Sequence, residues 1–508
     1  MAKKGTRASV KTKARAYSKR TKSICPVCLS VISARVFEKG GRILIEKSCR
    51  KHGRFEDVYW SDAKTFKRFL KYQIPGSPIG NPQAKSKGNC PLDCGLCDGH
   101  QTKTLLAEMD LTNRCNQRCP VCFANADAAG YVYEPTLEQV KAMLDMLRNQ
   151  KPNPVNSVQF LGGEPTLHPR LFEIVEYAKK VGFVDILIAS NGIKIAQDAG
   201  FARRLKEAGA RSIYLQFDGL TPESYTKLRG YNALPMKMKA IGNLRKVGVS
   251  ACLVPTVIKG VNDGQLGDII EFGRRNIGTI KAVNFQPLSF IGRTGRKSVN
   301  TKRMTITDIM ELVERQTNGK IKKEYWMPIS AFAPIEMFYE KFFNRRVCKS
   351  STHVHCGAGV YIFEKGDGYI TLNEFVDLDR VREIFLEESQ SKKRNLLGSA
   401  MANLALVAKL KGTIDFSKIP DYIDWKGMIT SAIFRGDLPQ KLKDKAMFIG
   451  CMHFMDPYNF DMDRVQRCCI HYATPDGREI PFCTYNIFHR ENVEKKYSSV
   501  YKKASTKR

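Results

Sequence analysis

The stretch CNQRCPVCF, residues 115–123, decides how this 508-residue chain is interpreted. Its three cysteines have the spacing C-x3-C-x2-C, so a short loop can hold three irons of a 4Fe-4S cluster and leave the fourth iron open to a ligand. The loop directly follows the strand-like TLLAEMDLT, residues 104–112. Half of a zinc site is the alternative. The context favours a cluster with one open iron on Cys115, Cys119 and Cys122.

Outward from this loop, strand-like and helix-like segments alternate six times between residues 101 and 292. Such alternation is typical of a parallel sheet, and parallel barrels build their sites at the carboxyl ends of the strands. The sequence therefore predicts an α/β fold with a partial (β/α)6 barrel. Three of the polar candidates, Ser190, Asn191 and Asp218, could instead only cap the helices that follow them. The candidate ligand-binding residues are Phe123, Gly162, Gly163, Glu164, Ser190, Asn191, Gln216 and Asp218.

CNQRCPVCF followed by FLGGEP, residues 160–165, resembles the radical S-adenosylmethionine (SAM) superfamily. The resemblance implies that the open iron chelates the amino and carboxylate groups of SAM. It also implies that one electron from the cluster breaks a carbon–sulfur bond and yields a 5'-deoxyadenosyl radical. In FLGGEP, the glycines permit close backbone approach, and the Glu164 carboxylate can meet a ligand ammonium; a simple turn residue is the alternative.

The amino-terminal part carries a second type of metal motif. Residues 1–24 hold nine Lys or Arg and no acidic residue, which predicts a basic disordered arm. In the Cys-rich region that we expect over residues 25–100, a ribbon hairpin presents Cys25, Cys28, Cys49 and His52 with the spacing of a mononuclear zinc or iron site.

Most remaining cysteines gather before the barrel and in the predicted carboxyl-terminal α+β region, residues 293–508. We expect Cys90, Cys94 and Cys97 to hold an auxiliary 4Fe-4S cluster with a distant fourth ligand, and a further group to hold another. Scattered free thiols are the alternative, and Cys252 is expected to be a buried structural thiol. The distant candidates are Cys348 and Cys356, and the further group is Cys451, Cys468 and Cys483.

Long strings along the whole chain resemble the archaeal tetraether lipid synthases. They include NFQPLSFIGR at 284–293, CGAGVYIF at 356–363 and CMHFMDPYNFDMDRVQRCC at 451–469. The resemblance implies carbon–carbon coupling of the terminal methyl groups of two isoprenoid lipid chains. Alkylation of a pterin or similar heterocycle, and radical modification of tRNA, are the alternatives within radical enzymes. A zinc-ribbon protein that binds nucleic acid is the non-enzyme alternative.

The formal net charge of +33 predicts a polyanionic partner, although it does not distinguish nucleic acid from anionic lipid. With the lipid interpretation, we expect isoprenoid phospholipid as substrate and a membrane surface as partner, and nucleic acid is disfavoured. A donor such as ferredoxin or flavodoxin is expected to supply electrons. No apolar stretch is long enough to span a membrane and no signal peptide is evident, so we expect a cytoplasmic protein at the inner face of the membrane.

Overall fold

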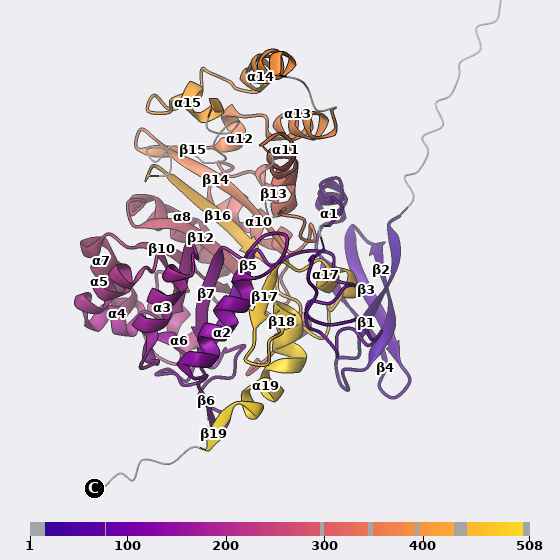
Figure 1. Ribbon diagram of the computed structural model, residues 1–508, viewed down its shortest axis with the longest axis vertical. Coiled ribbons are helices and arrows are strands. Elements are labelled where there is room, and N and C mark those ends of the chain that lie inside the picture. Colours follow the sequence, from indigo (N-terminus) through magenta and orange to yellow (C-terminus); the bar gives the residue numbers. More distant parts are fainter. Residues whose placement is uncertain are drawn as a thin grey trace, which may run out of the picture.

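The computed structural model describes residues 16–76, 78–294, 299–343, 349–391, 396–430 and 444–500. Figure 1 shows an antiparallel ribbon beside a larger α/β unit, with carboxyl-terminal elements packed between and above them. The ribbon has the strand order β1-β2-β3-β4. Its strands are β1 (Ser18–Ile24), β2 (Val31–Lys39), β3 (Arg42–Cys49) and β4 (Gly53–Trp60), and helix α1 (Ala63–Leu70) follows them.

The ribbon corrects one predicted boundary. The basic arm was expected to run to residue 24, but Ser18–Ile24 form β1 and pair with residues 31–37 of β2. The strand forms because its carboxyl-terminal end is buried, with Ser23 and Ile24 fully inaccessible, while its lysines stay in solvent. A count of positive charge alone does not reveal such a half-exposed strand. Residues 1–15 lie outside the described residues.

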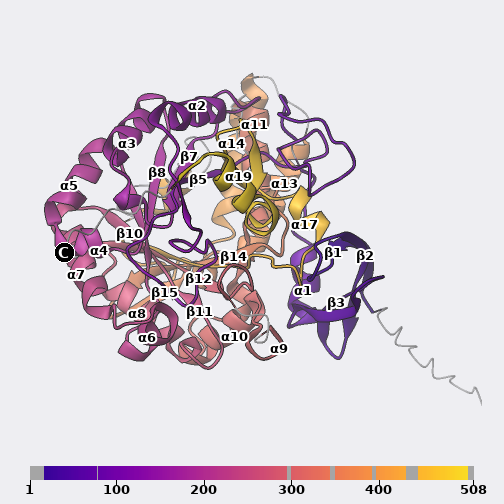
Figure 2. The ribbon, with the colours of Figure 1, turned by 90° about the horizontal axis from the view of Figure 1, so that it is seen from below.

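The prediction of a partial (β/α)6 barrel is confirmed. Six strands pair in parallel, each with the next along the chain. Figure 2 shows the helices in an arc outside these strands, which leaves the barrel open on one side. The strands are β5 (Leu106–Thr112), β7 (Ser157–Gly162), β8 (Asp185–Ser190), β9 (Ser212–Gln216), β10 (Ser250–Val254) and β12 (Ile280–Pro287). The helices are α2 (Leu137–Arg148), α3 (Leu171–Lys180), α4 (Ile193–Gln197), α5 (Ala199–Ala208), α6 (Pro222–Arg229), α7 (Leu234–Val247) and α8 (Leu266–Arg275).

The carboxyl-terminal region extends the barrel sheet at both edges. Strand β16 (Ala446–Met452) pairs in parallel with β12 and antiparallel with β14 (Gly357–Lys365). At the opposite edge, β17 (Ile470–Ala473) pairs in parallel with β5, and β18 (Glu479–Pro481) follows. Both edges of the open barrel are thereby covered, which removes unpaired backbone groups.

The remaining elements complete these layers. The helices are α9 (Val299–Lys302), α10 (Ile306–Gln316), α11 (Ala333–Phe343), α12 (Leu372–Phe375), α13 (Leu378–Gln390), α14 (Leu396–Lys411), α15 (Trp425–Thr430), α17 (Met462–Gln466), α18 (Phe482–Thr484) and α19 (Arg490–Lys496). The strands are β6 (Tyr131–Tyr133), β11 (Thr256–Val257), β13 (Met327–Pro328), β15 (Gly368–Thr371) and β19 (Ser498–Val500). Within the described residues, no helix is both long and apolar enough to cross a bilayer.

A buried ion-pair cluster joins the ribbon to the rest of the molecule. The guanidinium of Arg303 contacts the carboxylates of Asp57 on β4 and Asp456 after β16, and all three side chains are at least 92% inaccessible. Nearby, the Tyr59 hydroxyl donates to Asp461 Oδ2 at 2.7 Å. These contacts fix the ribbon against the carboxyl-terminal segment rather than leaving it as a tethered module.

Candidate metal and cofactor sites

The three cysteines of the barrel loop line one cavity of about 340 Å³ at the carboxyl ends of the strands. Arg293 holds the loop, because its guanidinium donates to the Cys119 carbonyl at 3.1 Å and to Asn125 Oδ1 at 3.0 Å. Burial raises the pKa of the Cys115 thiol to about 12. No fourth cysteine among the described residues lines this cavity. Three converging thiols with no fourth fit a cluster that keeps one iron open.

The Gly-Gly-Glu element packs directly against this loop. A Cβ atom on Gly162 would lie 2.2 Å from the Thr112 carbonyl oxygen, and one on Gly163 would lie 2.2 Å from that of Arg114. Only glycine therefore allows strand β7 to approach the loop backbone so closely. The close approach predicted for these glycines is thus made to the cysteine loop itself.

Glu164 is buried and held by several donors. Its carboxylate accepts from the Ser190 hydroxyl at 2.9 Å, the backbone N–H of Asn191 at 2.7 Å and the Thr166 hydroxyl at 2.6 Å. Burial raises the pKa of Glu164, and these hydrogen bonds lower it. Glu164, Ser190 and Asn191 all line the cavity, so three predicted residues form one network at the ends of neighbouring strands.

Gln216 also lines the cavity, but its position depends on a lysine that the sequence did not single out. Lys237 on α7 is fully buried, and its ammonium donates to Gln216 Oε1 at 2.8 Å and to the Asn191 carbonyl. Burial lowers the pKa of Lys237 to about 8. This lysine therefore ties the ends of β8 and β9 together behind the cavity wall.

The prediction that Asp218 contacts a ligand is not supported by the structure. Asp218 is fully buried and does not line the cavity, because its two carboxylate oxygens accept from Arg229 at 2.6 and 2.7 Å. The same guanidinium donates to the Val121 carbonyl at 3.2 Å and lies beside the Cys119 thiol. Asp218 therefore acts through Arg229, which supports the cysteine loop.

The floor of the cavity is polar, which the sequence analysis missed. Glu108 on β5, Gln159 on β7, Tyr214 on β9 and both Asn284 and Gln286 on β12 line it. Barrel interiors are normally filled by branched apolar side chains. A signal was present in LAEMDLT, because acidic residues at positions 108 and 110 are unusual in a strand expected to be buried on both faces.

The ribbon brings together the four predicted ligands of the mononuclear site. One ligand atom from each of Cys25, Cys28, Cys49 and His52 lies within 4.8 Å of the others. The Cys28 and Cys49 sulfurs are 3.9 Å apart, and the Cys25 sulfur is 3.5 Å from His52 Nδ1. Bonds of about 2.3 Å to a tetrahedral metal place sulfurs about 3.8 Å apart. The geometry fits a structural metal ion.

The auxiliary cysteines form two neighbouring groups. The pKa of the Cys94 thiol is raised by the neighbouring Cys90 and by burial, and the charges of Cys97 and Cys468 raise it further. Burial raises the pKa of Cys483, and the charges of Cys468 and Cys356 raise it further. Among the predicted fourth ligands, Cys356 thus joins the second group. The two groups are Cys90, Cys94 and Cys97, and Cys356, Cys468 and Cys483.

The predicted cysteines that remain are Cys451, Cys252 and Cys348. Cys451 lies on β16 in the main hydrophobic core and is fully buried. Burial raises its pKa, and the charge of Asp308 raises it further. That position in the apolar core gives no support to its predicted role as a cluster ligand. Cys252 on β10 was expected to be buried, but it is only half-buried, and it does not line the cavity. Cys348 lies outside the described residues.

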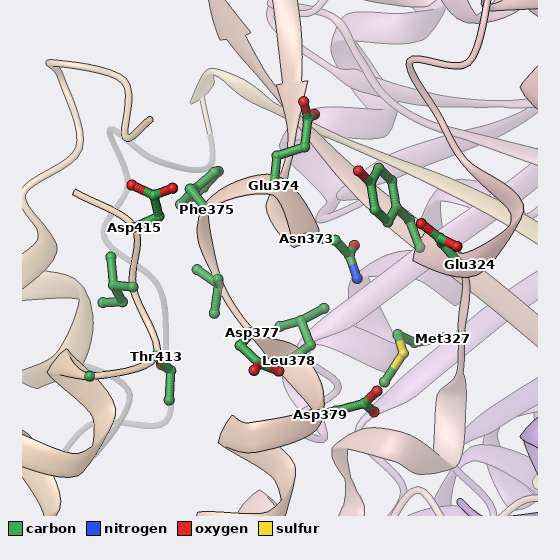
Figure 3. Close-up of a pocket in the computed structure, with 14 residues that line it drawn as sticks. Glu324, Met327, Asn373, Glu374, Phe375, Asp377, Leu378, Asp379, Thr413 and Asp415 are labelled. Atoms are coloured by element: carbon green, nitrogen blue, oxygen red, sulfur yellow. The ribbon is translucent and has the colours of Figure 1, made fainter. Parts of the chain in front are cut away.

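A second cavity, of about 470 Å³, is lined by several carboxylates (Figure 3). These carboxylates have structural partners. Asp377 caps α13, Asp379 accepts from the Tyr72 hydroxyl at 2.6 Å, and Asp415 pairs with Lys418 at 2.8 Å. Because its acids already serve caps and ion pairs, this cavity is a junction between elements.

Comparison with known proteins identifies the family of this chain. Residues 109–273 match the model of the radical SAM superfamily, and residues 17–61 match that of the HMPTM N-terminal zinc ribbon domain. The chain is 44% identical over 486 residues to the 7,8-dihydro-6-hydroxymethylpterin dimethyltransferase of Methanocaldococcus jannaschii, covering 94% of this chain and 96% of that protein. The chain belongs to the radical SAM family of this dimethyltransferase. The family implies a 4Fe-4S cluster and SAM as cofactors, as predicted.

Other matches cover a smaller part of the chain. The chain is 26% identical over 249 residues to the GTP 3',8-cyclase of Clostridium acetobutylicum, covering 46% of this chain and 77% of the cyclase. Among solved structures, Streptococcus suis SuiB bound to precursor peptide SuiA is 20% identical with a TM-score of 0.36, covering 43% of this chain and 46% of that one.

The comparison overturns the predicted lipid-coupling activity. The full-length relative is named for methyl transfer to a pterin, not for joining lipid chains. The quoted strings were assigned to the wrong activity because they mark a shared scaffold and cluster arrangement, which do not specify a substrate. The alternative of pterin alkylation is the one that the match favours.

Proposed function

We propose that this chain is a radical SAM methyltransferase that acts on a dihydropterin. The observation that carries the proposal is its similarity, along nearly its whole length, to a protein named as a dihydropterin dimethyltransferase. The polar floor of the cavity supports it, because a pterin ring has hydrogen-bonding groups along its edge.

The cavity residues divide into two roles. Cys115, Cys119 and Cys122 would hold the cluster, and the network around Glu164 would hold SAM above the cavity floor. When bound, the cluster supplies the electron that splits SAM into methionine and a 5'-deoxyadenosyl radical. The 5'-deoxyadenosyl radical would take a hydrogen atom from a pterin C–H bond, which gives 5'-deoxyadenosine and a pterin carbon radical. That carbon would then take a methyl group from a methyl donor, and one further electron from the reductant would return the demethylated donor to a closed-shell product. The cavity walls orient the pterin and exclude water. We propose ferredoxin or flavodoxin as the electron donor.

Deuterium transfer tests this function whatever the methyl source. Anaerobically reconstituted full-length protein is mixed with SAM, a strong reductant and 6-hydroxymethyl-7,8-dihydropterin deuterated at its carbon-bound positions. We expect the pterin to stimulate 5'-deoxyadenosine formation and its deuterium to appear in that product by mass spectrometry. A nucleoside free of deuterium, or stimulation by archaeal diether lipid and not by the pterin, would contradict the proposal.

We also propose that Cys356, Cys468 and Cys483 hold an auxiliary iron–sulfur cluster. Arg464 supports this, because it is 2% exposed, donates to the Cys356 sulfur at 3.4 Å and forms no ion pair with a carboxylate in the described part of the chain. A buried cation needs a neighbouring negative charge. A cluster with thiolate ligands is anionic and would supply that charge.

Cys468→Ala is expected to separate the two clusters in function. The variant should lose about four irons per chain and should no longer methylate the pterin. It should still cleave SAM, because Cys468 does not line the barrel cavity. Iron analysis and 5'-deoxyadenosine quantification check both points. Iron content equal to that of Cys252→Ala, which removes a half-buried thiol outside both groups, would contradict this assignment.

A further inference from the structure

The floor of the barrel cavity contains more polar groups than its own contacts satisfy. Gln159 on β7 is the direct cross-strand partner of Glu108 on β5, so the two side chains lie side by side on one face of the sheet. Across the barrel, the Tyr214 hydroxyl accepts from Gln286 Nε2 at 3.0 Å and from Asn284 Nδ2. These pairs face the same cavity as the cluster loop.

Two buried acceptors are left over. Glu108 Oε2 and Asn284 Oδ1 have no hydrogen-bond partner among the described residues, although the two side chains belong to residues that are only 3% and 7% exposed. Burial raises the pKa of Glu108 well above its usual range. A carboxyl group accepts hydrogen bonds through its oxygens, and its protonated form also donates one. Buried polar groups without partners are costly, so a polar ligand is the expected partner here.

The shape of the cavity suits a flat heterocycle. Glu108 lies four residues before the carboxyl end of β5, which places it about 13 Å below the level of the cluster loop. The apolar side chains of Leu106, Leu187 and Ile470 line the same space. A flat ring can contact such side chains with its faces while its edge meets the polar groups.

We infer that Glu108, supported by Gln159 and facing Tyr214, binds the 2-amino-4-oxopyrimidine edge of the dihydropterin. This inference rests on the proposed function and names the residues that recognise one edge of its substrate. The edge presents an amino group, a ring N–H and acceptor atoms side by side, which one carboxyl group can meet with two hydrogen bonds. The far end of the pterin then points toward the cysteine loop, where the reaction takes place.

A matched pair of ligands tests the inference. Binding of 6-hydroxymethyl-7,8-dihydropterin and of its 2-deaminated, 2-oxo analogue to the cluster-loaded, SAM-bound protein is measured anaerobically by calorimetry. Wild-type protein should prefer the 2-amino compound by roughly 10- to 100-fold. Glu108→Leu should bind the two compounds equally. Glu108→Gln keeps a donor and an acceptor, so it should retain most of the preference.

Controls separate recognition from folding. Glu479→Gln changes another buried carboxyl group, on β18 and outside the cavity, and should keep the wild-type preference. The electron paramagnetic resonance response of the cluster to SAM should be unchanged in every variant. A Glu108→Leu protein that keeps the preference would overturn the inference alone. Wild-type protein that binds neither compound would overturn the proposed function together with it.

Discussion

Cys119→Ala is expected to abolish reductive cleavage of SAM. The variant keeps two of the three thiols that line the cavity, and two protein ligands do not hold a 4Fe-4S cluster with a single open iron. Release of 5'-deoxyadenosine under a strong reductant should fall to the level seen without protein. Chromatographic quantification of that product, normalised to protein, is the measurement.

Cys252→Ala is the matched control for this loss. Its side chain is half-buried on β10 and does not line the cavity, so the variant should cleave SAM as the wild type does. Metal content at the ribbon should be equal in both variants, because Cys25, Cys28, Cys49 and His52 are unaffected. A Cys119→Ala protein that cleaves SAM at the wild-type rate would refute the assignment of the cluster loop.

Arg303→Met is expected to produce the largest loss of stability. The substitution removes the cation between Asp57 and Asp456 and leaves two buried carboxylates without their partner. Breaking a buried pair in this way costs about 3–5 kcal/mol in the free energy of unfolding. Urea unfolding followed by fluorescence of the tryptophans should show the shift, since Trp60 is fully buried at the end of β4, the strand that carries Asp57.

An exposed ion pair in the same ribbon gives the comparison. Arg35 pairs with Glu46 at 2.6 Å, but its side chain is 49% exposed. Arg35→Met should therefore change the free energy of unfolding by about 1 kcal/mol or less. Equal losses in the two variants would show that Arg303 does not join the ribbon to the rest of the chain.

Sequence reasoning succeeded where the chemistry is local. The spacing of Cys115, Cys119 and Cys122 fixes a loop that can hold three irons, and the spacing of Cys25 and Cys28 fixes a metal knuckle in a hairpin. The six strand–helix units were also predictable, because hydrophobic periodicity and glycine at the ends of helices are properties of short segments.

The features that sequence reasoning did not predict depend on contacts between distant segments. Strands β16 and β17 cover the two edges of the barrel, although they come more than 150 residues after its last strand. Asp218 ends a strand as a ligand-binding residue would, but Arg229 eleven residues later occupies its carboxylate. Neither pairing leaves a mark on local composition.

The substrate could not be predicted for a related reason. The polar floor comes from five residues on four strands, with Glu108, Tyr214 and Asn284 spread over more than 170 positions. Tyr214 and Asn284 are unremarkable within their own strands, and only the curvature of the barrel sheet brings them together with Glu108. Motifs of the cluster loop identify the radical chemistry, but they carry no information about this floor.

The most direct measurement is the electron paramagnetic resonance spectrum of the anaerobically reduced full-length protein, recorded with and without SAM. We expect the signal of the barrel cluster to shift when SAM is added, and we expect no such shift in Cys119→Ala. A wild-type spectrum that does not respond to SAM would contradict the claim that this loop presents an open iron to the cofactor.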